Sequence, residues 1–168
     1  MLKLSNLIKT IMKKITLFLF LLAVYSLTCG SVTAQKSSEK IKAEIMETLK
    51  QWNNAGKNAN LDQIMALYDN TDNIFMAGSD SGEIFKGKDQ IKGWLALLLK
   101  NNSFSWEMNR IDIDYNGKTA WVFVDGAMIV TNSKGKSRRT PYRFIGVLVN
   151  KNGNWKWRLF NGSVPQGH

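Results

Sequence analysis

Apolar residues recur at helical spacing in the first half of the chain. Ile41, Ile45, Leu49 and Trp52 lie three or four residues apart, which predicts an amphipathic helix that stops near Gly56. Two further stripes of this kind predict a helix from Asn60, with Leu61, Ile64, Met65 and Tyr68, and a helix after Gly87, with Ile91, Trp94, Leu95, Leu98 and Leu99.

From Phe104 onward the period changes to two, which is typical of β-strands. Asn116-Gly117 and Asn152-Gly153 are pairs that favour hairpin turns. We therefore expect long antiparallel strands, which include residues 120–128, 142–149 and 155–165. Two short strands, 74–76 and 83–86, are predicted before the third helix.

Three helices followed by an antiparallel meander predict an α+β domain whose sheet curls around the helices. The strand within residues 119–131 is apolar on both faces. We expect it to be buried on both sides, by helices on one side and by a second subunit on the other. In the last strand, alternation predicts Trp155 and Trp157 on one face, and Arg158 and Phe160 on the other.

The opening of the chain has the features of an export signal. Residues 15–27 are almost entirely apolar, Lys13-Lys14 precede them, and the small residues 32–34 follow. This pattern is typical of a secretory signal, and the run is shorter than the roughly 20 residues of a membrane-spanning helix. We predict a signal peptide at residues 1–34, with a possible start at Met12.

The predicted mature part, residues 35–168, is a single domain that is exported to the periplasm or secreted. Lipid attachment at Cys29 is a weaker alternative, because Ser26 and Thr28 stand where a lipidation site has other residues. We expect no membrane contact after the signal is removed.

Composition excludes several kinds of chemistry. Cys29 is the one cysteine, and the one histidine, His168, is the last residue, so we expect no disulfide, no metal site and no cofactor. Loss of the four leader lysines lowers the formal charge from +10 to +6, which we interpret as a solubilising surface without a nucleic-acid partner. Asp112 and Asp114 alternate with isoleucines and are interpreted as a solvated face.

The order of these elements resembles the NTF2-like superfamily, in particular its SnoaL-like and DUF4440-type bacterial members. The resemblance is carried by residues 64–68, 85–91, 120–121 and 155–165. It implies a conical half-barrel with a pocket between sheet and helices, often paired into a homodimer through the outer sheet face. The superfamily includes isomerases, dehydratases and binding proteins, so the fold alone does not decide the function.

Ketosteroid isomerisation is the best-understood chemistry on this fold, and it uses a carboxylate base with a tyrosine and a protonated aspartate. Alignment with that family places Trp52 at the tyrosine and Met76 at the base, and residues 142–149 contain no acidic residue. We therefore expect this mechanism to be absent.

The same alignment points Trp121, Phe123 and Asp125 into the pocket. Asp125 could then act as a general acid or base. The alternative is a structural carboxylate at a bulge, either solvated or paired with Arg143.

Three functions remain open at this point. The first is binding of a small, mostly apolar molecule, the second is a cofactor-independent isomerase, dehydratase or hydrolase-type enzyme that uses Asp125, and the third is a partner-binding dimeric module with a filled interior. The predicted pocket residues are Trp52, Tyr68, Met76, Trp94, Trp121, Phe123, Arg143, Arg158 and Asn161, although each aromatic side chain among them could equally belong to the core.

Overall fold

The computed structural model describes residues 38–166. The predicted export signal, Cys29 and His168 lie outside the described residues. The chain divides into two compact units, residues 1–41 and residues 42–168. Residues 38–41 are the described part of the first unit and are helical, and residues 42–166 are the described part of the second. None of the helices in residues 38–166 is long and apolar enough to cross a membrane.

The helices lie where the apolar stripes predict them. The first runs through residues 42–57 of the second unit. The second, α2 (Leu61–Ala66), begins at Asn60, whose side chain accepts a hydrogen bond from the Gln63 N–H at 3.0 Å, as a helix cap does. The third, α3 (Lys88–Leu99), follows Gly87, which has a φ of 82°.

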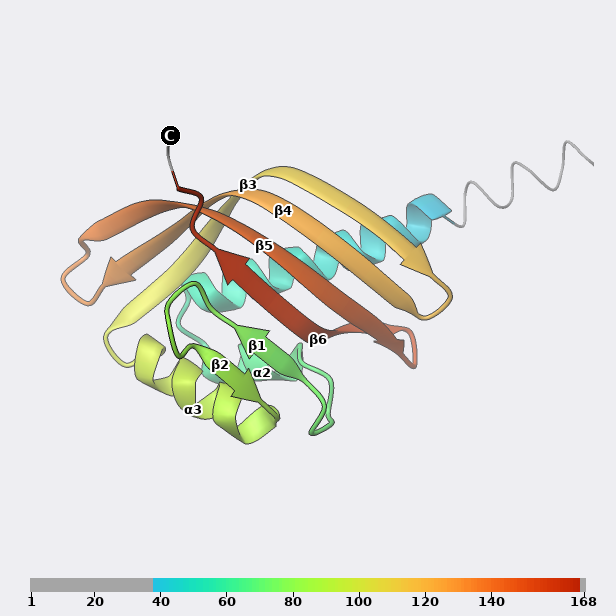
Figure 1. The fold of residues 1–168 in the computed structure, drawn as a ribbon, viewed down its shortest axis with the longest axis horizontal. Helices are drawn as coiled ribbons and strands as arrows, with labels where there is room; N and C mark the ends of the chain where they lie inside the picture. Colours follow the sequence, from blue (N-terminus) through green and yellow to red (C-terminus); the bar gives the residue numbers. More distant parts are fainter. Residues whose placement is uncertain (1–37, 167–168) are drawn as a thin grey trace, which may run out of the picture. The chain divides into compact units, whose positions relative to one another are not determined.

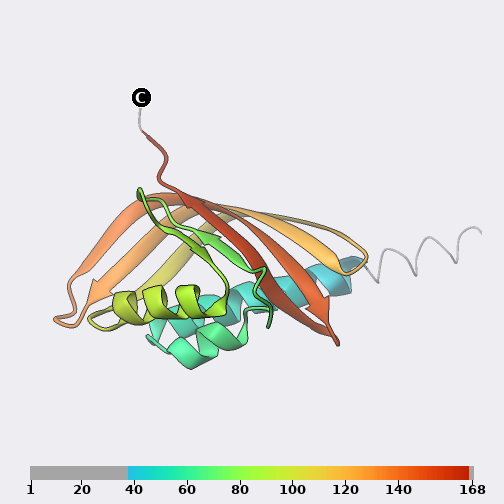
Figure 2. The same ribbon diagram turned by 60° about the horizontal axis from the view of Figure 1, so that its bottom comes forward.

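The strands form one sheet in the order β2-β1-β6-β5-β4-β3. Its long strands are antiparallel neighbours, as predicted (Figure 1), and β1 joins β6 in parallel. Figure 2 shows the sheet curving over the helices without closing, which is the α+β conical half-barrel expected from the sequence. The bounds are β1 (Phe75–Ala77), β2 (Ile84–Lys86), β3 (Asn102–Asn116), β4 (Thr119–Asn132), β5 (Ser137–Lys151) and β6 (Asn154–Ser163).

Even-numbered residues of β4 face the helices. Val122 and Val124 are 1% and 2% exposed, whereas Trp121 between two buried neighbours is 44% exposed. The prediction that Trp121, Phe123 and Asp125 point inward is therefore wrong. A strand that is apolar on both faces does not reveal which face is inside, and an error of one residue exchanges the two faces.

A β-bulge changes the alternation in β6. The register with β5 shifts between Val147 and Leu148, and Arg158 is the extra residue. As a result Trp157 and Phe160 are both buried, at 0% and 5% exposure, with their rings 6.2 Å apart. The expectation that Phe160 lies on the face opposite Trp157 is wrong, because a bulge reverses the alternation beyond it.

Candidate functional site

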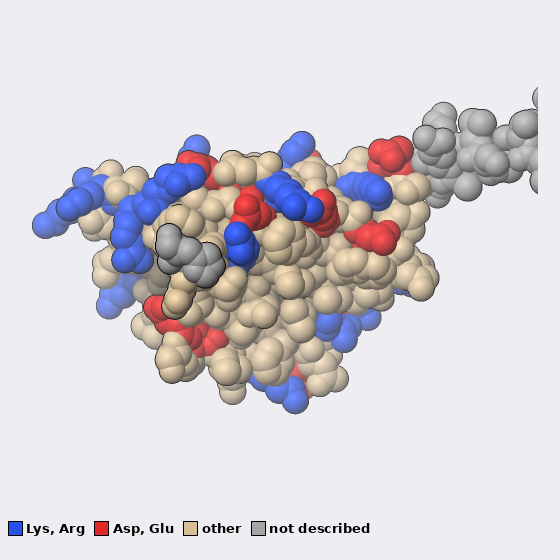
Figure 3. Space-filling model, turned by 45° about the horizontal axis from the view of Figure 1, so that its top comes forward, with Lys and Arg blue, Asp and Glu red and all other residues tan. Residues whose placement is uncertain are grey.

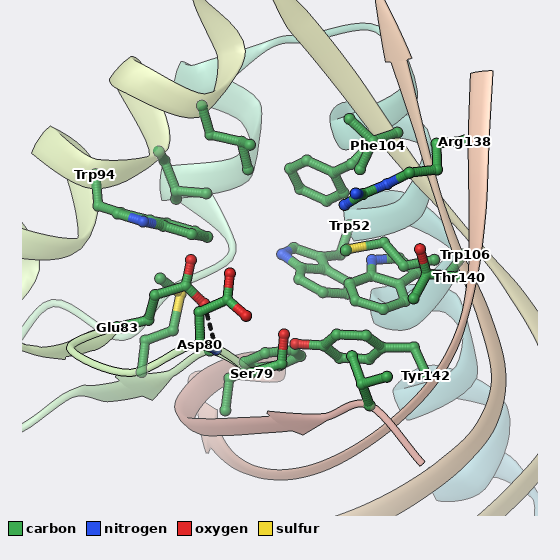
Figure 4. A pocket seen from close by; sticks show the side chains of 18 of the residues that line it. Trp52, Ser79, Asp80, Glu83, Trp94, Phe104, Trp106, Arg138, Thr140 and Tyr142 are labelled. Atoms are coloured by element: carbon green, nitrogen blue, oxygen red, sulfur yellow. Dashed lines mark hydrogen bonds between the residues drawn. The ribbon is translucent and has the colours of Figure 1, made fainter. Parts of the chain in front are cut away.

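A cavity of about 280 Å³ lies between the sheet and the helices. It is bounded by the first helix, α3, the β1–β2 loop and the interior faces of β3, β4, β5 and β6 (Figure 4). Most of its lining is aromatic or aliphatic. The lining residues are Trp52, Tyr68, Met76, Gly78, Ser79, Asp80, Glu83, Trp94, Leu95, Leu98, Phe104, Trp106, Met128, Val130, Arg138, Thr140, Tyr142, Phe160 and Val164.

Two stacked indoles form the centre of the lining. The rings of Trp52 and Trp106 are 5.4 Å apart with an angle of 13° between their planes. Asn53 fixes Trp106, since its side chain accepts from the Trp106 N–H at 2.7 Å and donates to the Trp106 C=O at 3.3 Å. These backbone groups lie on the edge strand β3, where no neighbouring strand is available to pair with them.

The buried side of the pocket contains donors that lack good partners. The Nε1 atoms of Trp52 and Trp106 are buried and have no hydrogen-bond partner among the described residues. The Tyr68 hydroxyl donates to the Met76 sulfur at 3.6 Å, and this is its one hydrogen bond within residues 38–166. A buried donor without a partner is unfavourable by about 1–3 kcal/mol, and the side chains of Trp52, Trp106 and Tyr68 all line the cavity.

Burial raises the pKa of Tyr68, and the adjacent indole N–H of Trp52 partly offsets this rise. No hydrogen bond joins this N–H to the hydroxyl, and Trp52 Nε1 has no partner among the described residues. Tyr68 is protonated and neutral at physiological pH, as an ordinary tyrosine also is. It can therefore act as a neutral donor toward a ligand.

The mouth of the pocket is formed by a tightly held acidic loop, residues 78–83. The Gly78 N–H donates to the Glu83 C=O at 2.8 Å, and the Glu83 N–H donates to the Asp80 C=O at 3.2 Å. The Asp80 N–H in turn donates to Glu83 Oε2 at 3.1 Å. A Cβ atom on Gly78 would come within 2.0 Å of Glu83 Oε2, so glycine is required here for the carboxylate to lie over the backbone.

The two carboxylates of this loop are not neutralised. No lysine or arginine in residues 38–166 forms an ion pair with Asp80 or Glu83. Their effect reaches Tyr142: burial raises the pKa of this tyrosine, a hydrogen bond with Ser79 lowers it, and the charges of Glu83 and Asp80 raise it. Figure 4 shows Asp80 and Glu83 on one side of the pocket and Arg138 on the other.

Four of the predicted pocket residues line this cavity: Trp52, Tyr68, Met76 and Trp94. The described residues contain no group of three or more His, Cys, Asp or Glu side chains that could hold a metal ion.

The other predicted site residues lie elsewhere. Asp125 faces outward and accepts from Arg143 Nε at 2.6 Å, in an ion pair whose side chains are 42% and 52% exposed. This is the structural arrangement considered as the alternative for Asp125. Asn161 pairs with Ile145 and is exposed on the same outer face as Trp121 and Phe123.

Arg158 is held away from the pocket by a buried carboxylate. Its Nη2 donates to Asp69, a residue that is 5% exposed and whose N–H donates to the Trp157 C=O at 2.9 Å. Because Arg158 is the extra residue of the bulge, its side chain is directed toward Asp69. Its role is therefore to join the segment after α2 to β6.

Sequence reasoning missed most of the polar pocket residues. The acidic loop has the composition of an ordinary solvent-exposed turn, and nothing local indicates that it borders a cavity. Thr140 and Tyr142 could have been predicted from the sequence. They share a strand face with Phe144, and the correct alternation in β5 would have placed all three inside.

The SnoaL-like domain family matches residues 45–166 of this sequence. This chain belongs to that family. No functionally curated protein matches it.

Solved structures agree with this assignment. An NTF2-like superfamily protein from Salmonella enterica has a TM-score of 0.67 at 16% identity, over 77% of this chain and 94% of its own. An NTF2-like protein of unknown function from Pseudomonas putida has a TM-score of 0.65 at 17% identity, over 77% and 90%. A ketosteroid isomerase-like protein from Erwinia carotovora has a TM-score of 0.60 at 18% identity, over 74% and 96%. At such identities the similarity establishes a shared NTF2-like fold and no shared activity.

Proposed function

We propose that this SnoaL-like domain binds a small, mostly apolar molecule in the pocket between its sheet and helices. The observation that carries the proposal is the open, aromatic-lined cavity of about 280 Å³. This volume lies at the small end of ligand sites, which suits a compound with one or two rings.

The hydrogen-bonding groups of the pocket refine this proposal. The indole N–H groups of Trp52 and Trp106 are buried without partners among the described residues. A ligand oxygen that accepts from them would remove the free-energy cost of a buried donor without a hydrogen bond. We therefore expect a ring that carries a carbonyl or hydroxyl oxygen to bind more tightly than the same ring without oxygen. Acetophenone and ethylbenzene form such a pair.

Calorimetric titration with this pair tests the proposal. Val130 lines the cavity, and Val130→Phe should fill it and abolish binding. Its neighbour Ile129 alternates onto the opposite face of β4, so Ile129→Phe provides a matched control that should bind acetophenone normally. Failure of both compounds to bind the unmodified protein, or equal binding by Val130→Phe, would refute the pocket as a binding site for such molecules.

The enzymatic alternative in its original form requires Asp125 in the pocket. Asp125 lies on the other face of the sheet and is paired with Arg143, so it cannot exchange protons with a ligand bound in the pocket. The carboxylates that do border the cavity are Asp80 and Glu83, and any acid-base chemistry in this pocket would have to use them.

A second proposal concerns the outer face of the sheet, which we propose pairs with a second copy of this chain. Trp121 and Ile145 are 44% and 49% exposed there, beside the Asp125–Arg143 ion pair. Acidic and basic side chains lie close together across this face (Figure 3), and a face with both signs of charge can complement itself about a two-fold axis. Light scattering should show a dimer that Trp121→Glu converts to a monomer, and a monomeric unmodified protein would contradict this.

Export of the domain stays a prediction from residues 1–34.

A further inference from the structure

We infer that the ligand of this pocket carries a protonated amine, which the β1–β2 loop recognises through Asp80 and Glu83. This inference rests on the proposed function, because it specifies the chemical class of the molecule that the pocket binds. It concerns the charge of the ligand, which the apolar lining by itself does not determine.

The first support is the uncompensated negative charge at the mouth. Asp80 and Glu83 both border the cavity, and neither forms an ion pair with a lysine or arginine in the described part of the chain. On the outer face of the sheet, Glu107, Asp112 and Asp125 each pair with an arginine, whereas the exposed Asp114 has no ion pair among the described residues. A bound cation would supply the missing partner at the mouth.

The second support is that the acidic loop is preorganised. Three hydrogen bonds at 2.8, 3.1 and 3.2 Å close residues 78–83 on themselves, and one of them uses the Glu83 carboxylate. Because the loop already holds Glu83 in place, little conformational freedom would be lost when a ligand binds. The carboxylate retains acceptor capacity for a ligand ammonium.

The third support is the aromatic surface beside the carboxylates. Trp94, Trp106 and Tyr142 line the same cavity as the two carboxylates, and Figure 4 shows Trp94 on the same side of it as Glu83. Aromatic faces attract ammonium groups through their quadrupoles, and the attraction strengthens as the cation loses water. Carboxylates together with aromatic faces therefore favour an organic cation over a neutral molecule of the same shape.

Among the described residues, Arg138 is the one basic side chain of the lining, and its charge opposes the binding of a cation. Arg138 and Asp80 are both exposed, so solvent screens both charges, while Glu83 is partly buried. Arg138 lies across the pocket from the two carboxylates (Figure 4). It is the second residue of β5, directly after the β4–β5 turn that contains Lys134 and Lys136. We expect Arg138→Gln to leave amine affinity unchanged or to raise it.

Three probes of similar size and different charge test this inference: 2-phenylethylamine, 2-phenylethanol and 3-phenylpropanoate. Calorimetric titration at pH 7 and low salt should show the amine binding about tenfold more tightly than the alcohol, as expected for one charge-assisted hydrogen bond. The carboxylate probe should bind most weakly. Asp80→Asn and Glu83→Gln should each reduce amine affinity several-fold and leave alcohol affinity within twofold.

Asp114→Asn is the matched control, because it removes the same charge from an exposed position on the outer face and should change none of the three affinities. Equal affinities for amine and alcohol would overturn the inference and leave the proposed function standing. Persistence of the amine preference in the double variant of Asp80 and Glu83 would also overturn it. Failure of all three probes to bind would refute the proposed function together with the inference.

Discussion

The two faces of one sheet treat similar residues in opposite ways. The inner face buries Trp157 and Phe144 at 0% and 1% exposure, whereas the outer face leaves Trp121 44% exposed. The carboxylates on the two sides of the sheet also differ in charge pairing. Asp125 on the outer face is paired with Arg143, whereas Asp80 and Glu83 at the inner cavity have no cationic partner in residues 38–166. An acid in an apolar strand therefore does not by itself identify a pocket residue, because such a strand can present either face to the interior.

The largest difference between the faces should appear in stability. Trp157→Ala removes a fully buried ring and should lower the free energy of unfolding by about 3–5 kcal/mol. Trp121→Ala removes a half-exposed ring and should lower it by about 1 kcal/mol or less. Urea denaturation of both variants measures this, and equal losses would contradict the assignment of inner and outer faces.

Ion pairs should show the same contrast on a smaller scale. Asp69→Asn leaves the partly buried Arg158 without its partner and should destabilise the protein by roughly 2–3 kcal/mol. Asp125→Asn breaks an exposed pair and should lower stability by about 0–1 kcal/mol. A loss at Asp125 as large as that at Asp69 would show that the outer pair is shielded from water, as a second subunit would shield it.

Alkaline pH should lower the free energy of unfolding through Tyr68, which is buried on the inner side of the sheet. Burial raises the pKa of Tyr68 above its unfolded value of about 10, so the folded state holds the hydroxyl proton more tightly. The resulting stability is fully present below about pH 10 and is lost as the pH rises above that value. Tyr68→Phe should flatten the fall in unfolding free energy between pH 9 and pH 11, and an unchanged slope in this variant would show that Tyr68 titrates normally.

The smallest expected effect concerns the acidic loop. Gly78→Ala places a Cβ where Glu83 Oε2 now lies, so the carboxylate must move. We expect the variant to remain folded and to lose a few-fold of the preference for 2-phenylethylamine over 2-phenylethanol. An undiminished preference with normal circular dichroism would show that the exact position of Glu83 is unimportant for recognition.

The sequence was sufficient to predict the helices, the long strands and the NTF2-like fold. Periodicity carried this information, because the stripe at Ile45 and Leu49 and the turn at Asn116-Gly117 are local signals. Four pocket residues were also predicted, since Trp52, Tyr68, Met76 and Trp94 lie on elements whose inner face is clear from their surroundings.

The rest of the site depended on information that is not local. In β4 both Val122 and Phe123 are apolar, so alternation could not identify the inner face. In β6 the bulge at Arg158 reversed the alternation before Phe160. Asp80 and Glu83 line the pocket only because the tertiary fold places the β1–β2 loop at the same cavity as Tyr142 of β5.

The most direct test of the account follows the six tryptophan indole N–H signals by heteronuclear NMR during titration with acetophenone. Each tryptophan can be assigned by a single Trp→Phe substitution. The account predicts that the signals of Trp52 and Trp106 move strongly while that of Trp121 stays in place. Movement of the Trp121 signal with fixed Trp52 and Trp106 signals would place the ligand on the outer face and contradict the account.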